Sequence, residues 1–178
     1  MILDYKNEKF ECINKMTFIV DTMLGKLSRW LRILGYDTIY DPDLTIKQLA
    51  EESEKHNAIF LTRRKRLPEN LIFRNLIFIP HDRFEDQIKF IVNKFGLSLK
   101  DQIFTRCIIC NSKVSQVSKE EVSSIVPERT YAGISTFFKC PQCKNIYWIG
   151  THYRNTIEKL KRIFQTENLS LKGTNNGI

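Results

Sequence analysis

The chain has 178 residues, of which 42% are hydrophobic and 27% charged, with only 7 Gly and 5 Pro. This length excludes a large multidomain enzyme, and the composition excludes a disordered or low-complexity chain, so most of it can bury a core. Lys and Arg number 28 against 20 Asp and Glu, and the formal net charge of +8 favours a polyanionic partner, with nucleic acid first.

The first half of the chain alternates short β-rich runs with amphipathic helical patterns. We expect strands over residues 17–21, 36–40, 58–62 and 76–79. We expect helices between and after them over residues 23–34, 45–56 and 82–96. Thr45 with Gln48 has capping-box spacing, and Asp82 with Glu85 is expected to cap the last of these helices. The alternation predicts an α/β domain over residues 16–98, with a parallel sheet flanked by helices.

The pattern changes after residue 98. Between two cysteine pairs we expect β-rich pieces over residues 113–117, 122–126 and 135–139, in a small unit that spans 103–150. A last amphipathic helix is expected over 152–166, followed by a flexible tail over 167–178, which is rich in Gly, Asn and Ser.

Two cysteine pairs have the spacing of metal-binding knuckles. They are Cys107-Ile-Ile-Cys110 and Cys140-Pro-Gln-Cys143. Four thiolates satisfy the tetrahedral coordination of zinc and leave no position for a catalytic water, so we predict a structural zinc ribbon. Two disulfides, or four unrelated buried thiols, are the alternatives. Cys12 stands apart from both pairs and is expected to be an ordinary thiol.

Nothing near the start of the chain predicts export. The first ten residues mix charges of both signs, and no later run has the length of a membrane span. We expect no membrane association and a cytoplasmic or other reducing intracellular compartment, where paired cysteines are more often metal ligands than disulfides.

Acidic residues follow two of the expected strands, where parallel sheets bind ligands and metals. Asp21 ends the first strand, and Asp41 and Asp43 follow the second, so they could hold Mg²⁺ or Mn²⁺ together. Glu51, Glu52 and Glu54 lie on the next helix, where at least two of them fit better as its solvated face.

Cations surround the same predicted edge. The third strand is followed by four in succession, Arg63, Arg64, Lys65 and Arg66, and a guanidinium beside Asp21 would compete with a metal for the carboxylate. Three more recur on the polar side of the first helix, at Lys26, Arg29 and Arg32. All seven are candidates for RNA phosphate contacts, although they could simply be solvating charges.

Tyr147 and Trp148 are candidates for base stacking or for packing in a ribbon core. His152 is a candidate for a phosphate contact or for a place at the start of the last helix.

These motifs together resemble a known family. They are the run from Phe18 to Asp37, the segment Ile59-Phe-Leu-Thr-Arg63, the two cysteine pairs and Tyr147-Trp-Ile-Gly-Thr-His152. The set, over about residues 16 to 153, resembles the Mut-seven C-terminal ribonuclease domain, a PIN-like nuclease fold fused to a zinc ribbon.

The resemblance implies metal-dependent ribonuclease ancestry. It matches Asp21 to the family's first active-site aspartate and places Asp43 in the segment that carries a second acid. Two positions depart from the family pattern: Arg64 stands where an Asp usually follows the Leu-Thr-Arg motif, and Ile46 stands where an acid often opens the second helix.

Three functions are compatible with this sequence. The departures favour an RNA-binding PIN-like protein in which cleavage is weak or lost, such as a subunit of a ribonucleoprotein complex. An active Mg²⁺- or Mn²⁺-dependent endoribonuclease, with Asp21 and Asp43 as metal ligands, is the alternative. A protein-interaction adaptor organised by the ribbon is a weaker one.

Overall fold

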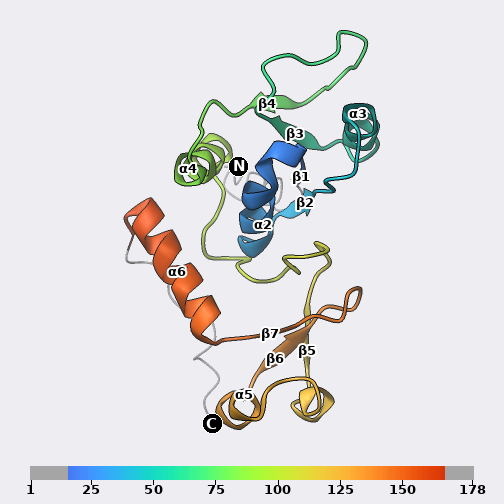
Figure 1. Ribbon diagram of the computed structural model, residues 1–178. Helices are drawn as coiled ribbons and strands as arrows, with labels where there is room; N and C mark the ends of the chain where they lie inside the picture. Colours follow the sequence, from blue (N-terminus) through green and yellow to red (C-terminus); the bar gives the residue numbers. More distant parts are fainter. Residues whose placement is uncertain (1–15, 167–178) are drawn as a thin grey trace, which may run out of the picture.

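The computed structural model describes residues 16–166, which fold around two sheets, one above the other in Figure 1. The upper sheet is parallel, with strand order β2-β1-β3-β4. Its strands are β1 (Thr17–Val20), β2 (Asp37–Ile39), β3 (Ile59–Thr62) and β4 (Leu76–Phe78). The four predicted strands and their parallel arrangement are therefore confirmed.

The strand register aligns three residues at the carboxyl ends of the strands. Val20 pairs with Leu61, so Asp21, the next residue, lies beside Thr62, and Thr62 in turn pairs with Phe78. Residues side by side in a sheet point to the same face. Asp21, Thr62 and Phe78 therefore form a row on one face of the sheet.

Helices cover both faces of this sheet, as the alternating pattern predicts. The larger core packs one face against α2 (Gly25–Ile33), α4 (Phe84–Phe95) and α6 (Thr151–Phe164). The smaller core packs Ile19 and Phe60 on the other face against Leu49 of α3 (Ile46–Lys55). Figure 1 shows α3 on one side of the strands and α2 and α4 on the other. A short 3₁₀ helix, η1 (Thr22–Leu24), joins β1 to α2.

Of the two predicted helix caps, the cap of α3 is confirmed and that of α4 is wrong. Thr45 and Gln48 form the predicted capping box of α3, since each side chain accepts a hydrogen bond from the other residue's backbone N–H. The helix α4 begins after Arg83 with no side-chain cap. Asp82 lies one residue farther out and is ion-paired to Arg63, which explains why its carboxylate does not cap the helix.

Gly35 follows the end of α2 and has a φ of 91°, a backbone conformation that residues with a side chain rarely adopt. A Cβ at this position would lie 2.1 Å from the carbonyl oxygen of Gln102, so the segment after α4 packs directly against the glycine. This close approach brings the second sheet to the end of α2.

The lower sheet is antiparallel, in the order β5-β6-β7. Its strands are β5 (Ser115–Val117), β6 (Phe137–Lys139) and β7 (Ile146–Trp148), and two short helices, η2 (Glu120–Val122) and α5 (Glu128–Gly133), lie between β5 and β6. The strand predicted over 122–126 is wrong. The backbone N–H of Val126 bonds the carbonyl of Val122, as in a helical turn. Both valine side chains are buried, whereas Ser124, which would share their face in a strand, is exposed.

The helix α6 returns from the lower sheet to the upper one (Figure 1). It places Ile157, Leu160 and Ile163 in the larger core, and Lys159 pairs with Glu85 of α4. Within residues 16–166, no helix is long and apolar enough to span a membrane. Cys12 and the predicted tail over 167–178 lie outside the described residues.

Candidate functional site

Asp21 lies at the carboxyl end of β1 and is fully buried. Its backbone N–H continues the sheet by bonding the carbonyl oxygen of Leu61 at 2.9 Å. Two hydroxyls donate to the carboxylate: Thr22 Oγ1 to Oδ1 at 3.1 Å and Thr62 Oγ1 to Oδ2 at 2.5 Å. The carboxylate is therefore held in a fixed orientation by β3 and by the start of η1.

Arg64 contacts both oxygens of the same carboxylate. Its Nε donates to Oδ2 at 2.8 Å and its Nη2 to Oδ1 at 3.2 Å, a two-pronged pair of the kind that suits guanidinium. The backbone N–H of Arg64 also donates to Thr62 Oγ1, at 3.0 Å, and so fixes the turn after β3. Burial raises the pKa of Asp21, but the Arg64 and Thr62 hydrogen bonds and the Arg64 charge outweigh it and hold the pKa below its usual range.

This environment does not fit a divalent cation at Asp21. Both carboxylate oxygens already accept two hydrogen bonds each, and the positive charge of Arg64 lies directly against them and repels a cation. Among residues 16–166, the only group of three or more His, Cys, Asp or Glu side chains close enough to share a metal is formed by cysteines. Asp21 is thus not part of such an acidic cluster.

The other acidic candidates lie on exposed surface. Asp43 is exposed, and its backbone N–H bonds the carboxylate of Asp41 at 2.9 Å. Glu51 is exposed and lies 3.9 Å from Lys47, as expected for a solvated helix face. Ile46, where the family pattern has an acid, opens α3 and packs against the smaller core.

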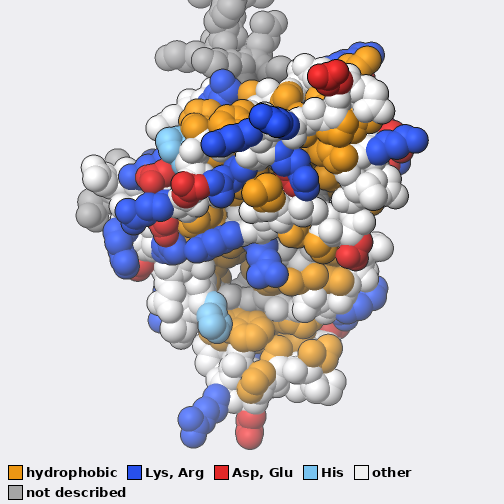
Figure 2. All heavy atoms as spheres, turned by 45° about the horizontal axis from the view of Figure 1, so that its top comes forward, with side chains coloured by type: hydrophobic (Ala, Val, Ile, Leu, Met, Phe, Trp, Pro, Cys, Tyr) orange, Lys and Arg blue, Asp and Glu red, His pale blue; other side chains and the backbone are white. Residues whose placement is uncertain are grey.

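Most of the predicted phosphate-binding cations lie on the surface. Lys26, Arg29, Arg64, Lys65 and Arg66 are exposed, whereas Arg63 is half-buried. Figure 2 shows Lys and Arg side chains gathered over the upper part of the face it presents, with some Asp and Glu among them.

The prediction that Arg32 lies on the exposed polar side of its helix is wrong. It is 4% exposed, and its guanidinium donates to backbone carbonyls of two segments. Nε bonds Thr38 at 2.9 Å, and Nη1 bonds Ile109 at 2.6 Å and Ile108 at 3.2 Å. The i+3 spacing could not reveal this, because the carbonyls come from a distant part of the chain. Arg32 is therefore a structural anchor between α2 and the first knuckle.

The four cysteines form one cluster, as predicted. Their Sγ atoms all lie within 4.8 Å of one another, and all four thiols are free. The closest sulfurs come from different knuckles, with Cys107 and Cys143 3.4 Å apart and Cys110 and Cys140 3.3 Å apart. These separations are much longer than a disulfide bond and suit the corners of a tetrahedral thiolate site. The cluster could hold one zinc ion.

Residues after the knuckles support this geometry. Asn111 has a φ of 71° after the first knuckle, and Lys144 has a φ of 64° after the second. Asn145 donates its side-chain N–H to Cys143 Sγ at 3.1 Å.

The first knuckle is docked on the edge strand β2. The Asn111 side chain accepts from the backbone N–H of Thr38 at 3.0 Å and donates to Asp37 at 2.6 Å, and Arg106 also bonds Asp37 at 3.2 Å. No motif in the sequence predicts these contacts. Asp37 lies beside the Gly35 turn, and only that position hints at its role.

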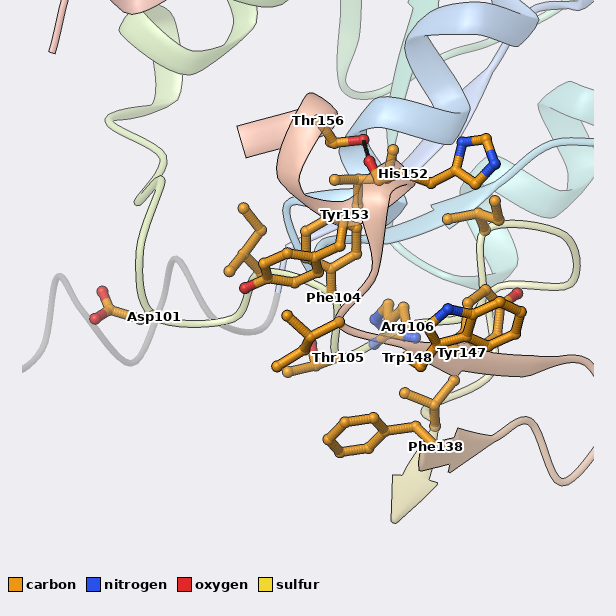
Figure 3. A pocket seen from close by; sticks show the side chains of 15 residues that line it. Asp101, Phe104, Thr105, Arg106, Phe138, Tyr147, Trp148, His152, Tyr153 and Thr156 are labelled. Atoms are coloured by element: carbon orange, nitrogen blue, oxygen red, sulfur yellow. Dashed lines mark hydrogen bonds between the residues drawn. The ribbon is translucent and has the colours of Figure 1, made fainter. Parts of the chain in front are cut away.

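A cavity of about 380 Å³ lies where the ribbon meets α6 and the end of α2. Figure 3 shows Phe104 and Tyr153 on one side of it and Tyr147 and Trp148 on the other. The Tyr147 hydroxyl lies 3.0 Å from Cys107 Sγ, which connects this ring to the cysteine cluster. His152 borders the cavity and is exposed. Base stacking by Tyr147 and Trp148 stays a prediction.

A parallel sheet flanked by helices, with a buried aspartate at its carboxyl edge, is followed by a small antiparallel sheet whose four cysteines could hold a metal; together they define an α/β protein with an appended ribbon. Residues 16–160 match the family model of the Mut7-C RNAse domain, and the chain belongs to that family. No curated protein and no solved structure matches the chain. The family gives the protein a ribonuclease-related role.

Proposed function

We propose that this protein binds RNA through the cations around Asp21, as a PIN-like subunit of a ribonucleoprotein complex in which cleavage is weak or lost. The contact between Arg64 and Asp21 carries the proposal. The ribonuclease family supplies the class of ligand, and the net charge of +8 agrees with a polyanion.

The loss of cleavage follows from what a metal-dependent nuclease requires. The metal must be held by carboxylate oxygens while it also holds the scissile phosphate. Asp21 instead neutralises Arg64, and Ile46 replaces an acid with an apolar side chain. The remaining cations can bind phosphates without a metal, because their contacts release counterions from the nucleic acid.

An active endoribonuclease is the second candidate, and the family match favours it. The Arg64 side chain is 40% exposed and could leave Asp21 for a substrate phosphate. Asp21 and Asp43 would then hold Mg²⁺ or Mn²⁺ with help from a further acid, Glu51 first.

The four cysteines would hold one zinc ion with a structural function. Four thiolates close the coordination sphere, so the ion would cross-link the two knuckles without activating water. The zinc ion would thereby help to hold the ribbon against β2.

The two candidates are separated by assaying binding and cleavage on the same samples. Anisotropy of a labelled mixed-sequence RNA measures binding, and incubation with Mn²⁺ measures cleavage. We expect tight, salt-dependent binding with little cleavage, and weaker binding for the triple variant Lys26→Ala/Arg29→Ala/Lys65→Ala.

Arg129, an exposed cation on the ribbon, provides the matched control, and Arg129→Ala should bind as the wild type does. Cleavage at a rate typical of enzymes that Asp21→Asn abolishes would establish the second candidate. No RNA binding by the wild type at low salt would reject both.

A further inference from the structure

Phe78 is unusual among the aromatic side chains of this protein. It is 43% exposed, whereas every other Phe, Tyr and Trp between residues 16 and 166 is buried or half-buried. Leu76, two residues earlier on the same strand, is 40% exposed. Alternation along β4 places these two side chains on one face and sends Ile77 to the larger core on the other.

The smaller core explains why Phe78 stays in solvent. On the same face, Phe60 is fully buried and stacks on Phe73, with ring centroids 4.6 Å apart. Leu49 of α3 belongs to that cluster, but neither Leu76 nor Phe78 does. Since β4 is the edge strand, its last side chain on this face extends past the cover that α3 provides.

The exposed ring lies next to the Asp21 site. Thr62, the neighbour of Phe78 in the row at the strand ends, donates its hydroxyl to Asp21 and accepts the backbone N–H of Arg64. A groove of about 550 Å³ joins these parts, lined by Thr62, Arg64, Lys65, Leu67, Leu76 and Phe78. Lys65 and the Phe78 ring thus share one open groove with Arg64, whose charge is paired with Asp21.

This combination is what single-stranded nucleic acids bind. Proteins that hold them without sequence preference pair a basic groove along the phosphates with aromatic rings on which bases stack. The bases of a duplex are already stacked on one another and cannot reach such a ring.

We propose that the groove binds single-stranded RNA, with one base stacked on Phe78 and the adjacent phosphate held by Lys65. The inference rests on the proposed function and narrows its ligand to unpaired RNA. Any of the four bases can occupy the ring, because each has a flat face.

The test compares Phe78→Ala, Phe78→Leu and Phe78→Trp with the wild type, using a short unstructured RNA and a hairpin-free RNA duplex. Loss of a stacked base should weaken binding of the single strand about tenfold in the Ala and Leu variants. Duplex binding and the slope of affinity against salt should not change, because the phosphate contacts remain. The Trp variant should keep its affinity, and the single strand should quench its added fluorescence.

Ile125→Ala provides the matched control, because Ile125 is another exposed apolar side chain but lies in the ribbon. The RNA affinity of this variant should equal that of the wild type. Wild-type affinity in Phe78→Leu would overturn the inference while leaving the proposed function intact. An equal loss of single-strand and duplex binding would also overturn the inference. The same holds for a change of oligomeric state in Phe78→Leu that leaves its RNA affinity unchanged. Failure of the wild type to bind any RNA would instead reject the proposed function.

Discussion

The guanidinium of Arg32 donates a 2.6 Å hydrogen bond to the carbonyl oxygen of Ile109, a residue 77 positions later in the chain. Ile109 lies between Cys107 and Cys110, so a helix that begins beside Asp21 is tied at its other end to the first knuckle. Burial lowers the pKa of Arg32, and the neighbouring Cys107, Cys110 and Asp37 oppose this by attracting its charge. The contact joins the two parts of the protein.

Arg32→Leu should therefore destabilise the protein. It leaves the buried carbonyl of Thr38 and the carbonyl of Ile109 without their donor, at a cost of roughly 3 kcal/mol of unfolding free energy. Urea denaturation followed by circular dichroism measures the change. Arg29→Leu, an exposed substitution one turn earlier, should change the same quantity by less than about 0.5 kcal/mol. Equal effects at both positions would show that Arg32 is not an anchor.

Purified protein made under reducing conditions should contain one zinc ion per chain. The geometry of the four sulfurs suits the metal, and zinc binding should be coupled to folding of the ribbon. Elemental analysis gives the stoichiometry, and Cys143→Ser should lower it, whereas Cys12→Ser should not. Chelation should also lower Tm, because Arg32 and Asn111 hold the first knuckle against β2. Protein free of zinc, or two intact disulfides, would contradict this.

RNA affinity should fall steeply as the salt concentration rises. The slope of log K against log salt should decrease in magnitude with each phosphate-binding cation that is removed. Lys65→Ala should reduce the magnitude of the slope of log K against log salt by about 0.7 for a single strand, and Arg66→Ala should do the same if it contacts a phosphate. Affinity should drop across many sequences alike, because phosphate contacts read no bases. A Lys65→Ala/Arg66→Ala protein with the wild-type slope would place the RNA elsewhere, for example on the ribbon or α6.

Arg64→Asp should create or raise Mn²⁺-dependent ribonuclease activity. The change removes the positive charge from Asp21 and adds a carboxylate that can share a cation with it. Ile46→Asp could be needed as well, at some cost to the smaller core. Isothermal titration with Mn²⁺ and RNA cleavage assays measure the two effects. The control Asp21→Asn/Arg64→Asp should lose both, and activity that survives in this control would come from a contaminant or another site.

Stability at acid pH should depend on the contact between Arg64 and Asp21. Since the pKa of Asp21 is lowered in the folded protein, its carboxylate stabilises the fold above about pH 4 and loses this contribution as the pH falls further. Arg64→Ala removes that charge, so the pKa of Asp21 rises towards its unfolded value and less stability is lost as the pH falls. Unfolding free energies between about pH 3 and 7 measure this. Lys65→Ala should follow the wild-type curve, and so would Arg64→Ala if the contact were absent in solution.

The sequence alone determined the features that depend on nearby residues. Alternating strands and helices predicted the parallel sheet, because burial imposes a regular period on each element. The capping box at Thr45 and the two cysteine knuckles were readable because their partners lie within a few residues. Arg64 next to Asp21 was also readable, since parallel strands bring their carboxyl ends to one edge of a sheet.

Only the tertiary structure decided the features that join distant segments. It buried Arg32 under the carbonyls of a knuckle, although its i+3 spacing matched that of the exposed cations. It turned residues 122–126 into helical turns, because Val122 and Val126 both fill the small ribbon core. It also left Phe78 uncovered, since α3 shields the inner strands but not the edge. A pattern along the chain records which side chains are apolar or charged, whereas the partner that covers each one is chosen by the packing of elements far apart in sequence.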